Sequence, residues 1–388
     1  MNAEFKVFYN NTAATEKMLG EIAEITVEQQ IDRVWEARIK IPVCMTEEGV
    51  WESESVPAYQ KFSRVRVEAR RGEGDFTPLI DGRIVGHDTE RSSIPGKSVL
   101  TLVVHDDSAL LHGQDEVCRY EAATDSDIAR EIFEAAELGG ALDIEPTATR
   151  PDNPAAAIIQ RGTKMQILRS LAARHQNFYA YVLPGKKAGE SIGCFRRLPV
   201  LPDEKLPALV MFGEDANLAE FNVRENARSP SEVVAATMSL RDKSITTSTS
   251  SYRDAALLGD EVSTDADEAN VTRRRLPPGQ TDTVDLDAAT QGAAARSGFS
   301  LEADGSVLPL CYAGVLSPYR VVAVRLSDSR FSANYVVFKV VHTLTASSYT
   351  QSFTVKGNAV SPSASASASA PAASASASAS FNVQVSIF

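Results

Sequence analysis

Cysteine is scarce in this chain. Its 388 residues include only four cysteines, and these lie far apart in the sequence: Cys44, Cys118, Cys194 and Cys311. A structural zinc site needs clustered cysteine and histidine ligands, such as a C-x-x-C pair, and the sequence has no such pair. The spacing therefore disfavours a zinc site and predicts isolated, buried thiols in a reducing compartment.

Long apolar runs are missing as well. No window of the sequence approaches the roughly 18 apolar residues that a membrane helix needs. The first residues, MNAEFKVFYNN, lack the basic and apolar segments of a secretory signal. We therefore expect a protein without a membrane segment. We also expect it to be synthesised in the cytoplasm and released, if at all, by a route that needs no signal.

Positive charge is in deficit, with a formal net charge of -12 and a pI of about 5.1. Nonspecific nucleic-acid binding needs a positive surface that replaces counterions, so the composition predicts no specific or general nucleic-acid binding. Arg273-Arg274-Arg275 is the compact basic run. We favour a solvated loop there, paired locally with the acidic residues Asp265, Asp267 and Glu268, over a nucleic-acid contact.

The sequence also lacks the motifs of common active sites. It contains no H-E-x-x-H, no G-x-S-x-G and neither of the common glycine-rich phosphate loops. His105-Asp106-Asp107 is the candidate for an acid–base or metal cluster, but it follows a predicted strand, where aspartate commonly starts a turn. We favour the turn. The sequence thus predicts no catalytic residue, no cofactor and no metal, and a protein that is not an enzyme.

The first 112 residues have a period-two pattern of apolar residues. Clear examples are Phe5-Val7-Tyr9, Ile25-Val27 and Ile39-Ile41, with similar runs at 64–68, 80–86 and 98–105. Glycine, proline and aspartate separate these runs. Alternation of this kind indicates antiparallel strands with one buried face, which predicts a small barrel or sandwich over residues 1–112.

The pattern changes to a small α/β module over residues 113–206. Thr124 to Asp127 supply a helix start, and Leu138-Gly139-Gly140 ends that helix. A second helix follows Gly162-Thr163 and stops near 175–177. A strand then follows at Phe178–Val182, ending in a turn at Pro184-Gly185.

Strand patterns return over residues 207–360, with strong signals at 321–326, 335–344 and 349–355. The stretch 241–295 is polar and is broken by prolines. A structureless loop of that length is unusual inside a compact domain. We therefore predict an excursion there, with helix near Ala255–Leu258 and Ala288–Arg296.

The end of the chain differs from the rest. Residues 361–380 are almost entirely serine and alanine, which cannot bury a core and predict a flexible linker. The final segment, 381–388, is strand-like, with four apolar residues on one face: Phe381, Val383, Val385 and Ile387. Two interpretations stand about even, namely docking onto a partner by strand addition and an edge strand on this protein's own sheet.

Three stretches resemble the baseplate hub proteins of contractile phage tails and injection systems, the late control protein D family, which are similar to the N-terminal part of type VI secretion spike proteins. The stretches are Pro78–Ile84 with the following strand to Asp106, then 124–133 with 159–182, and finally 335–353. Gln176-Asn177 stands where glycine is common in the family. Their order and spacing over nearly residues 3–358 carry the resemblance.

The resemblance implies two similar tube-like antiparallel β-barrels that flank the α/β insert. It further implies a homotrimer whose six barrels form a pseudo-sixfold ring. Such a ring adapts the hexameric tail tube protein to a trimeric spike protein and contacts other baseplate proteins. The implied location is the baseplate of a phage virion or injection particle, after synthesis in the bacterial cytoplasm. A tail-associated cell-wall-degrading enzyme and a receptor- or sugar-binding module are the alternatives.

Overall fold

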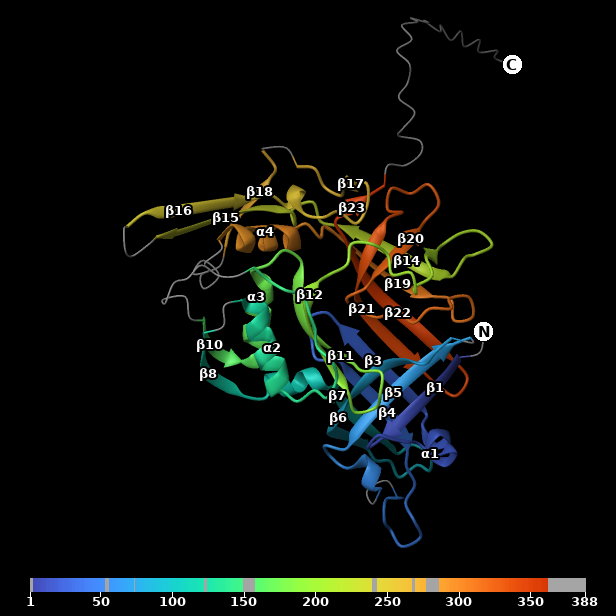
Figure 1. Cartoon of the computed structure of the whole chain (residues 1–388). Helices are drawn as coiled ribbons and strands as arrows, with labels where there is room; N and C mark the ends of the chain where they lie inside the picture. Colours follow the sequence, from blue (N-terminus) through green and yellow to red (C-terminus); the bar gives the residue numbers. More distant parts are fainter. Residues whose placement is uncertain are drawn as a thin grey trace, which may run out of the picture.

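The computed structural model describes residues 3–52, 56–72, 74–121, 124–148, 158–238, 243–266, 269–276 and 286–361. The fold is mainly β, with few helices, as the sequence predicts. Figure 1 shows a long sheet, an α/β insert on one side of it, and a hairpin that extends from the upper part of the molecule. The terminal residues 381–388, with Phe381, Val383, Val385 and Ile387, lie outside the described residues.

The first half of the sheet comes from the N-terminal segment. Apolar residues alternate along its strands and turn inward, so that in β4 every second residue is buried. The elements are β1 (Ala3–Tyr9), β2 (Thr12–Ala13), α1 (Glu16–Glu21), β3 (Glu24–Gln30), β4 (Glu36–Pro42), a short 3-10 helix η2 (Pro57–Tyr59), β5 (Arg64–Arg71), β6 (Thr77–Glu90) and β7 (Val99–Asp106).

The insert has both predicted helices. Thr124 caps one by accepting a hydrogen bond from Asp127 N, and Thr163 forms a capping box with Gln166 at the other. Asn177, at the position where the family often has glycine, adopts φ 59°, a conformation that asparagine tolerates. The elements are η3 (Asp107–His112), β8 (Asp115–Tyr120), α2 (Asp125–Ala135), β9 (Asp143–Ile144), β10 (Ile158–Thr163), α3 (Lys164–Ala173), β11 (Phe178–Pro184) and β12 (Ser191–Arg197).

The second half of the sheet has its own core. Most of its buried residues, from Leu206 to Val360, form a cluster separate from that of the first half, whereas Val321, Val336, Leu344 and Tyr349 belong to the first half's cluster. The strands are β13 (Leu209–Val210), β14 (Leu218–Glu225), β19 (Leu301–Val307), β20 (Val321–Arg325), β21 (Asn334–Leu344), β22 (Tyr349–Gly357) and β23 (Ala359–Val360).

The polar excursion is ordered where it is described. It consists of β15 (Ser231–Met238), β16 (Ile245–Ser250), η5 (Tyr252–Asp254), β17 (Glu261–Val262), β18 (Thr272–Arg275) and α4 (Leu286–Ser297). The helix predicted near 288–296 is confirmed as α4. The helix predicted near 255–258 is wrong, because only a single 3-10 turn forms, at Tyr252–Asp254, and it ends at Ala255, which has an extended backbone conformation.

The two halves form one continuous sheet. Its strand order is β14-β19-β22-β21-β3-β4-β7-β6-β5-β1-β2, with β20 and β13 branching from β21. The halves join where β21 pairs antiparallel with β3. Two similar tube-like β-barrels were expected, and two similar β halves are present; closure of either half into a barrel is not detected among the described strands. Backbone hydrogen bonds instead link the two halves edge to edge.

Each half nevertheless repeats the same strand order. The first half runs β1-β5-β6-β7-β4-β3 across the sheet, and the second runs β13-β20-β21-β22-β19-β14. Numbered along the chain, both orders are one, four, five, six, three, two. They differ in that β13 pairs parallel with β20, whereas β1 pairs antiparallel with β5.

The repeat extends to single residues. One row of directly opposed residues crosses the first half, and a matching row crosses the second: Val27, Ala37, Val104 and Ile84 in one, and Val223, Ala303, Val355 and Val337 in the other. A register shift follows Ile84 in β6 and Val337 in β21. The two halves are therefore equivalent in strand order, residue row and bulge position.

Candidate functional site

The junction between the two halves contains a buried histidine. His342, on β21, is completely buried opposite Val27 of β3. Its Nδ1 lies 2.9 Å from Tyr349 Oη, and its Nε2 lies 3.3 Å from Gln29 Oε1. Gln29 in turn donates from Nε2 to the carbonyl oxygen of Leu79, at 2.6 Å. This chain of contacts ties strands from both halves together inside the sheet.

His342 is held neutral. Burial, reinforced by the Arg71 guanidinium, lowers its pKa to about 3. Arg71 stacks over the Tyr349 ring at 4.5 Å from the centroid and also donates to the Tyr349 carbonyl oxygen. A histidine that does not protonate near neutral pH is a poor general acid or base, so this cluster fits a structural joint between strands.

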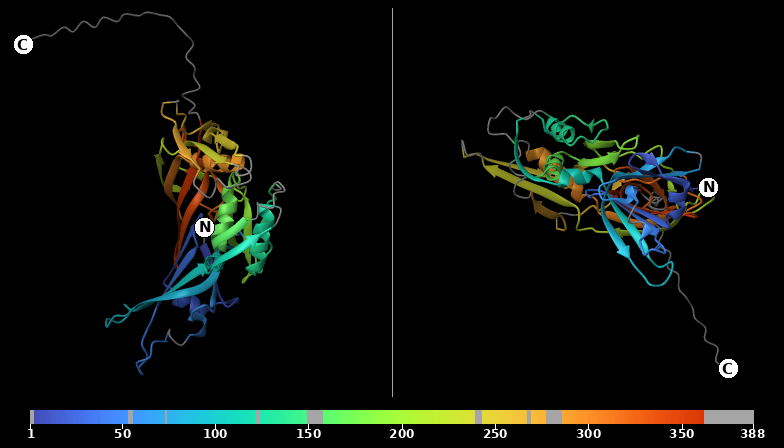
Figure 2. Two further views of the ribbon diagram at one scale, coloured as in Figure 1. Left: turned by 90° about the vertical axis from the view of Figure 1, so that its left-hand side faces the viewer. Right: turned by 90° about the horizontal axis from the view of Figure 1, so that it is seen from below.

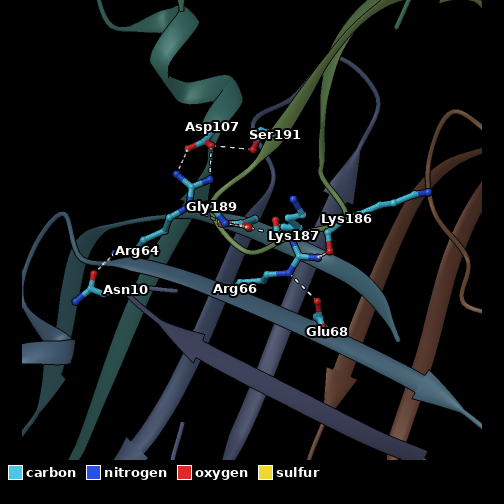
Figure 3. A network of polar contacts seen from close by, with 10 residues as sticks. Asn10, Arg64, Arg66, Glu68, Asp107, Lys186, Lys187, Gly189 and Ser191 are labelled. Atoms are coloured by element: carbon cyan, nitrogen blue, oxygen red, sulfur yellow. Dashed lines mark hydrogen bonds and ion pairs between the residues drawn. The ribbon is translucent and has the colours of Figure 1, made fainter. Parts of the chain in front are cut away.

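A charged network fixes the insert onto the first half-sheet (Figure 3). Asp81, fully buried on β6, accepts from Arg64 Nε at 2.7 Å, Arg66 Nη1 at 2.9 Å and Gly189 N at 3.0 Å. Arg66 also donates to the carbonyl oxygens of Lys186 and Lys187 in the loop between β11 and β12. Charge-assisted bonds of this kind are the strong ones, and here they bridge two separate sheets.

His105-Asp106-Asp107 is a strand end followed by a turn, as predicted. β7 ends at Asp106, and the 3-10 helix η3 begins at Asp107. The three side chains point to different partners. His105 Nε2 lies 3.3 Å from Glu36 Oε2, and Asp107 accepts from Arg64 Nη2 at 2.6 Å. The third, Asp106, accepts from the backbone N–H of Trp35, and its burial raises its pKa to about 7. Because they face different partners, they do not form an acid–base cluster.

A cleft of about 280 Å³ opens where the first half, the insert and the second half meet. Tyr181 of the insert stacks on Tyr319 of the second half, with ring centroids 3.7 Å apart. The charged residues that line the cleft form two ion pairs: Asp143 with Arg196, and Asp203 with Arg320. The lining therefore binds the three parts together and offers no unpaired carboxylates for catalysis.

The remaining sequence candidates lie in ordinary structural positions. Arg273-Arg274-Arg275 lies on β18 and not in the predicted loop, and Arg273 pairs with Glu232 at 2.9 Å. Of the acidic residues that the sequence suggested as partners, Asp265 pairs with Arg253, and Asp267 and Glu268 lie outside the described residues. The prediction of buried thiols holds only for Cys194, since Cys44 and Cys311 are exposed and Cys118 is half-buried. In the described part of the chain, no three histidine, cysteine or acidic side chains gather around a point that could hold a metal ion. No described helix is long and apolar enough to cross a membrane.

No family model matches the sequence, and no curated protein matches it. Solved structures do match. The tail protein from Neisseria meningitidis MC58 superposes with a TM-score of 0.60 over 92% of this chain and 97% of its own, at 11% identity. The 43 kDa tail protein of prophage MuSo2 from Shewanella oneidensis gives 0.62 over 91% and 98%, at 13% identity. The chain has the fold of phage tail proteins.

A third similar structure belongs to a secretion machine. An Escherichia coli component of the type VI secretion system, described as similar in structure to the T4 bacteriophage tail proteins gp27 and gp5, gives a TM-score of 0.50 at 10% identity. The match covers 92% of this chain and 77% of that one. The resemblance drawn from sequence is thus confirmed at the level of the fold.

Proposed function

We propose that this protein is a structural hub in the baseplate of a contractile tail or injection system. In this proposal it is a homotrimer with pseudo-sixfold symmetry that adapts the hexameric tail tube protein to a trimeric spike protein. Its role is structural and not enzymatic. Residues 1–112, 113–206 and 207–360 are the first tube-like domain, the insert and the second tube-like domain.

The repeated strand order of the two half-sheets is the observation that carries the proposal. Three copies of a chain with two equivalent halves present six similar units around one axis. Such a ring matches a sixfold tube on one face and keeps true threefold symmetry for a spike on the other. The similarity to tail proteins in fold supports the same role.

Mass photometry of the purified chain tests this proposal. We expect a species of three times the 41.8 kDa chain mass, either alone or after addition of the tail tube protein. A matched sample of tube protein alone gives the background. A chain that stays monomeric in both conditions, or a cleared zone on a cell-wall zymogram, would contradict the structural role.

We also propose that the terminal segment 381–388 docks onto the spike or another baseplate protein, through Phe381, Val383, Val385 and Ile387. Alternating apolar residues at the end of a serine–alanine linker suit strand addition to a partner's sheet. Deletion of 361–388 should leave the trimer intact and reduce the amount of spike protein retained on a pull-down. Full retention by the shortened chain would refute the docking role.

A further inference from the structure

The junction inside the chain uses one edge of β21 twice. The first part of β21 pairs with β20 up to Val336, and from Lys339 to Leu344 the same edge pairs with β3 instead. β20 therefore covers only the first part of this edge of β21. The rest of the edge pairs with β3, a strand from the other half. This arrangement is an in-chain example of how one half-sheet docks against the next.

Two other edges correspond to those that meet at the in-chain junction, one on β6 and one on β14. No described strand pairs with either of them. β6 corresponds to β21, and β5 covers its edge only as far as Ile84, whose carbonyl oxygen accepts from Phe62 N. Beyond that point, the part of the chain that is described places no strand on this edge, and the β6–β7 hairpin extends away from the sheet (Figure 2). β14 corresponds to β3 and ends the sheet, so among described strands its outer edge is likewise free.

An unpaired strand edge is a template for another strand. We propose that the free edge of β6, residues 85–90, pairs antiparallel with the outer edge of β14 in a second copy of this chain. This pairing rests on the proposed trimer and specifies which strands join neighbouring copies in it. Each half then uses the same two edges, so that in-chain and inter-chain junctions alternate around a closed ring of six half-sheets.

The residue rows fix the register of this contact. Val337 is equivalent to Ile84, so His342, five residues further along β21, is equivalent to Thr89. His342 faces Val27 in the chain, and Val27 is equivalent to Val223. Thr89 of one copy therefore faces Val223 of the next. Thr89 is exposed and Val223 is half-buried, so both side chains are available for this contact.

The charges at this register are complementary. The pair next to Thr89 and Val223 brings Asp88 opposite Arg224. Asp88 already lies 3.0 Å from Arg38, and Arg224 lies 2.8 Å from Asp304. Joining the two pairs gives a row of alternating sign across the junction. The in-chain junction also has an ion pair across it: Glu28, the equivalent of Arg224, lies 2.7 Å from Lys339, two residues before the directly opposed Val341.

Cysteine cross-linking tests the register. The background carries Cys44→Ser and Cys311→Ser. A variant that adds both Thr89→Cys and Val223→Cys should run as a covalent trimer on a denaturing gel after treatment with a short bifunctional maleimide. Thr89→Cys with Ala219→Cys is the matched control. Ala219 is exposed on the same strand but lies about 13 Å further along, so it should give little cross-linking. Variants that carry only one of the two introduced cysteines control for the native Cys118 and Cys194 and should remain uncross-linked.

A charge swap gives an independent readout. Asp88→Arg or Arg224→Asp alone should weaken the trimer about fivefold at low salt, and the double variant should restore it. The melting temperature of each variant controls for the loss of its in-chain partner. If the wild-type chain forms a trimer but the paired cysteines do not cross-link and the charge variants do not weaken it, this contact is wrong and the proposed hub still stands. A wild-type chain that never forms trimers would refute the hub proposal as well.

Discussion

The two internal junctions of this protein are built in opposite ways. The half-sheets meet through backbone pairing of β3 with β21, and the three hydrogen-bonded side chains there, His342, Tyr349 and Gln29, are uncharged, with the Arg71 guanidinium stacked on the Tyr349 ring. The insert belongs to separate sheets and is held by buried charges around Asp81. Where the backbone carries the connection, neutral side chains suffice. Where it does not, carboxylates and guanidinium groups must make the contact.

The charged junction should be the more fragile of the two. Asp81→Asn leaves the Arg64 and Arg66 guanidinium groups buried without their shared carboxylate, and we expect a loss of about 3–5 kcal/mol in the free energy of unfolding. Urea denaturation measures this loss. The matched control is Glu121→Gln, which removes an exposed pair with Arg119 and should cost at most about 1 kcal/mol. Equal losses in both variants would remove the distinction between the junctions.

The neutral junction should instead be sensitive to acid. His342 has a pKa of about 3 in the folded protein and about 6.5 when unfolded. Between these values the unfolded chain binds the proton first, so this contribution to stability declines as the pH falls and is constant above pH 6.5. From pH 6.5 to 5 the decline is about 2 kcal/mol.

His342→Gln is the comparison for this effect. The variant keeps hydrogen-bonding capacity without a titrating group, so its stability should fall less steeply over the same pH range. Urea midpoints of both proteins at pH 5, 6 and 7 measure the difference. Parallel curves for the two proteins would argue against a buried, neutral histidine.

Asp106, beside the charged network, should show an effect of opposite sign and of similar size per pH unit. Burial raises its folded pKa to about 7, above the ordinary aspartate value. The folded state therefore holds the proton that the unfolded state releases, and stability is lost as the pH rises from about 4 to 7. We expect about 1.4 kcal/mol between pH 5 and 6. Asp106→Asn should abolish this slope, and an unchanged slope would exclude Asp106 as its source.

Secondary structure was predictable from the sequence where a few neighbouring residues determine it. Period-two alternation located strands such as β3 and β4, because one face of each is buried. The helix caps at Thr124 and Thr163 were visible because the capping bonds span three residues. The helix near 255–258 failed for the converse reason, since a weak local pattern there was overridden by tertiary packing.

The polar networks were not predictable in the same way. Arg66 alternates with Val65 and Val67 on β5, at a position where the period-two pattern predicts an exposed side chain, so the sequence gives no signal of its burial. Its partner carbonyls lie 120 residues further along the chain. A lone histidine such as His342 gives no signal at all, because Gln29, one of its two partners, is 313 residues away.

The sequence by itself determined the strands, the insert helices, the polar excursion and the resemblance to tail hub proteins, since these follow from periodicity, caps and the order of short stretches. The tertiary structure alone decided that the halves share one sheet, that they repeat one strand order, and which edges stay free. The pairing of β3 with β21 joins residues more than 300 positions apart, and no local preference encodes which edge meets which.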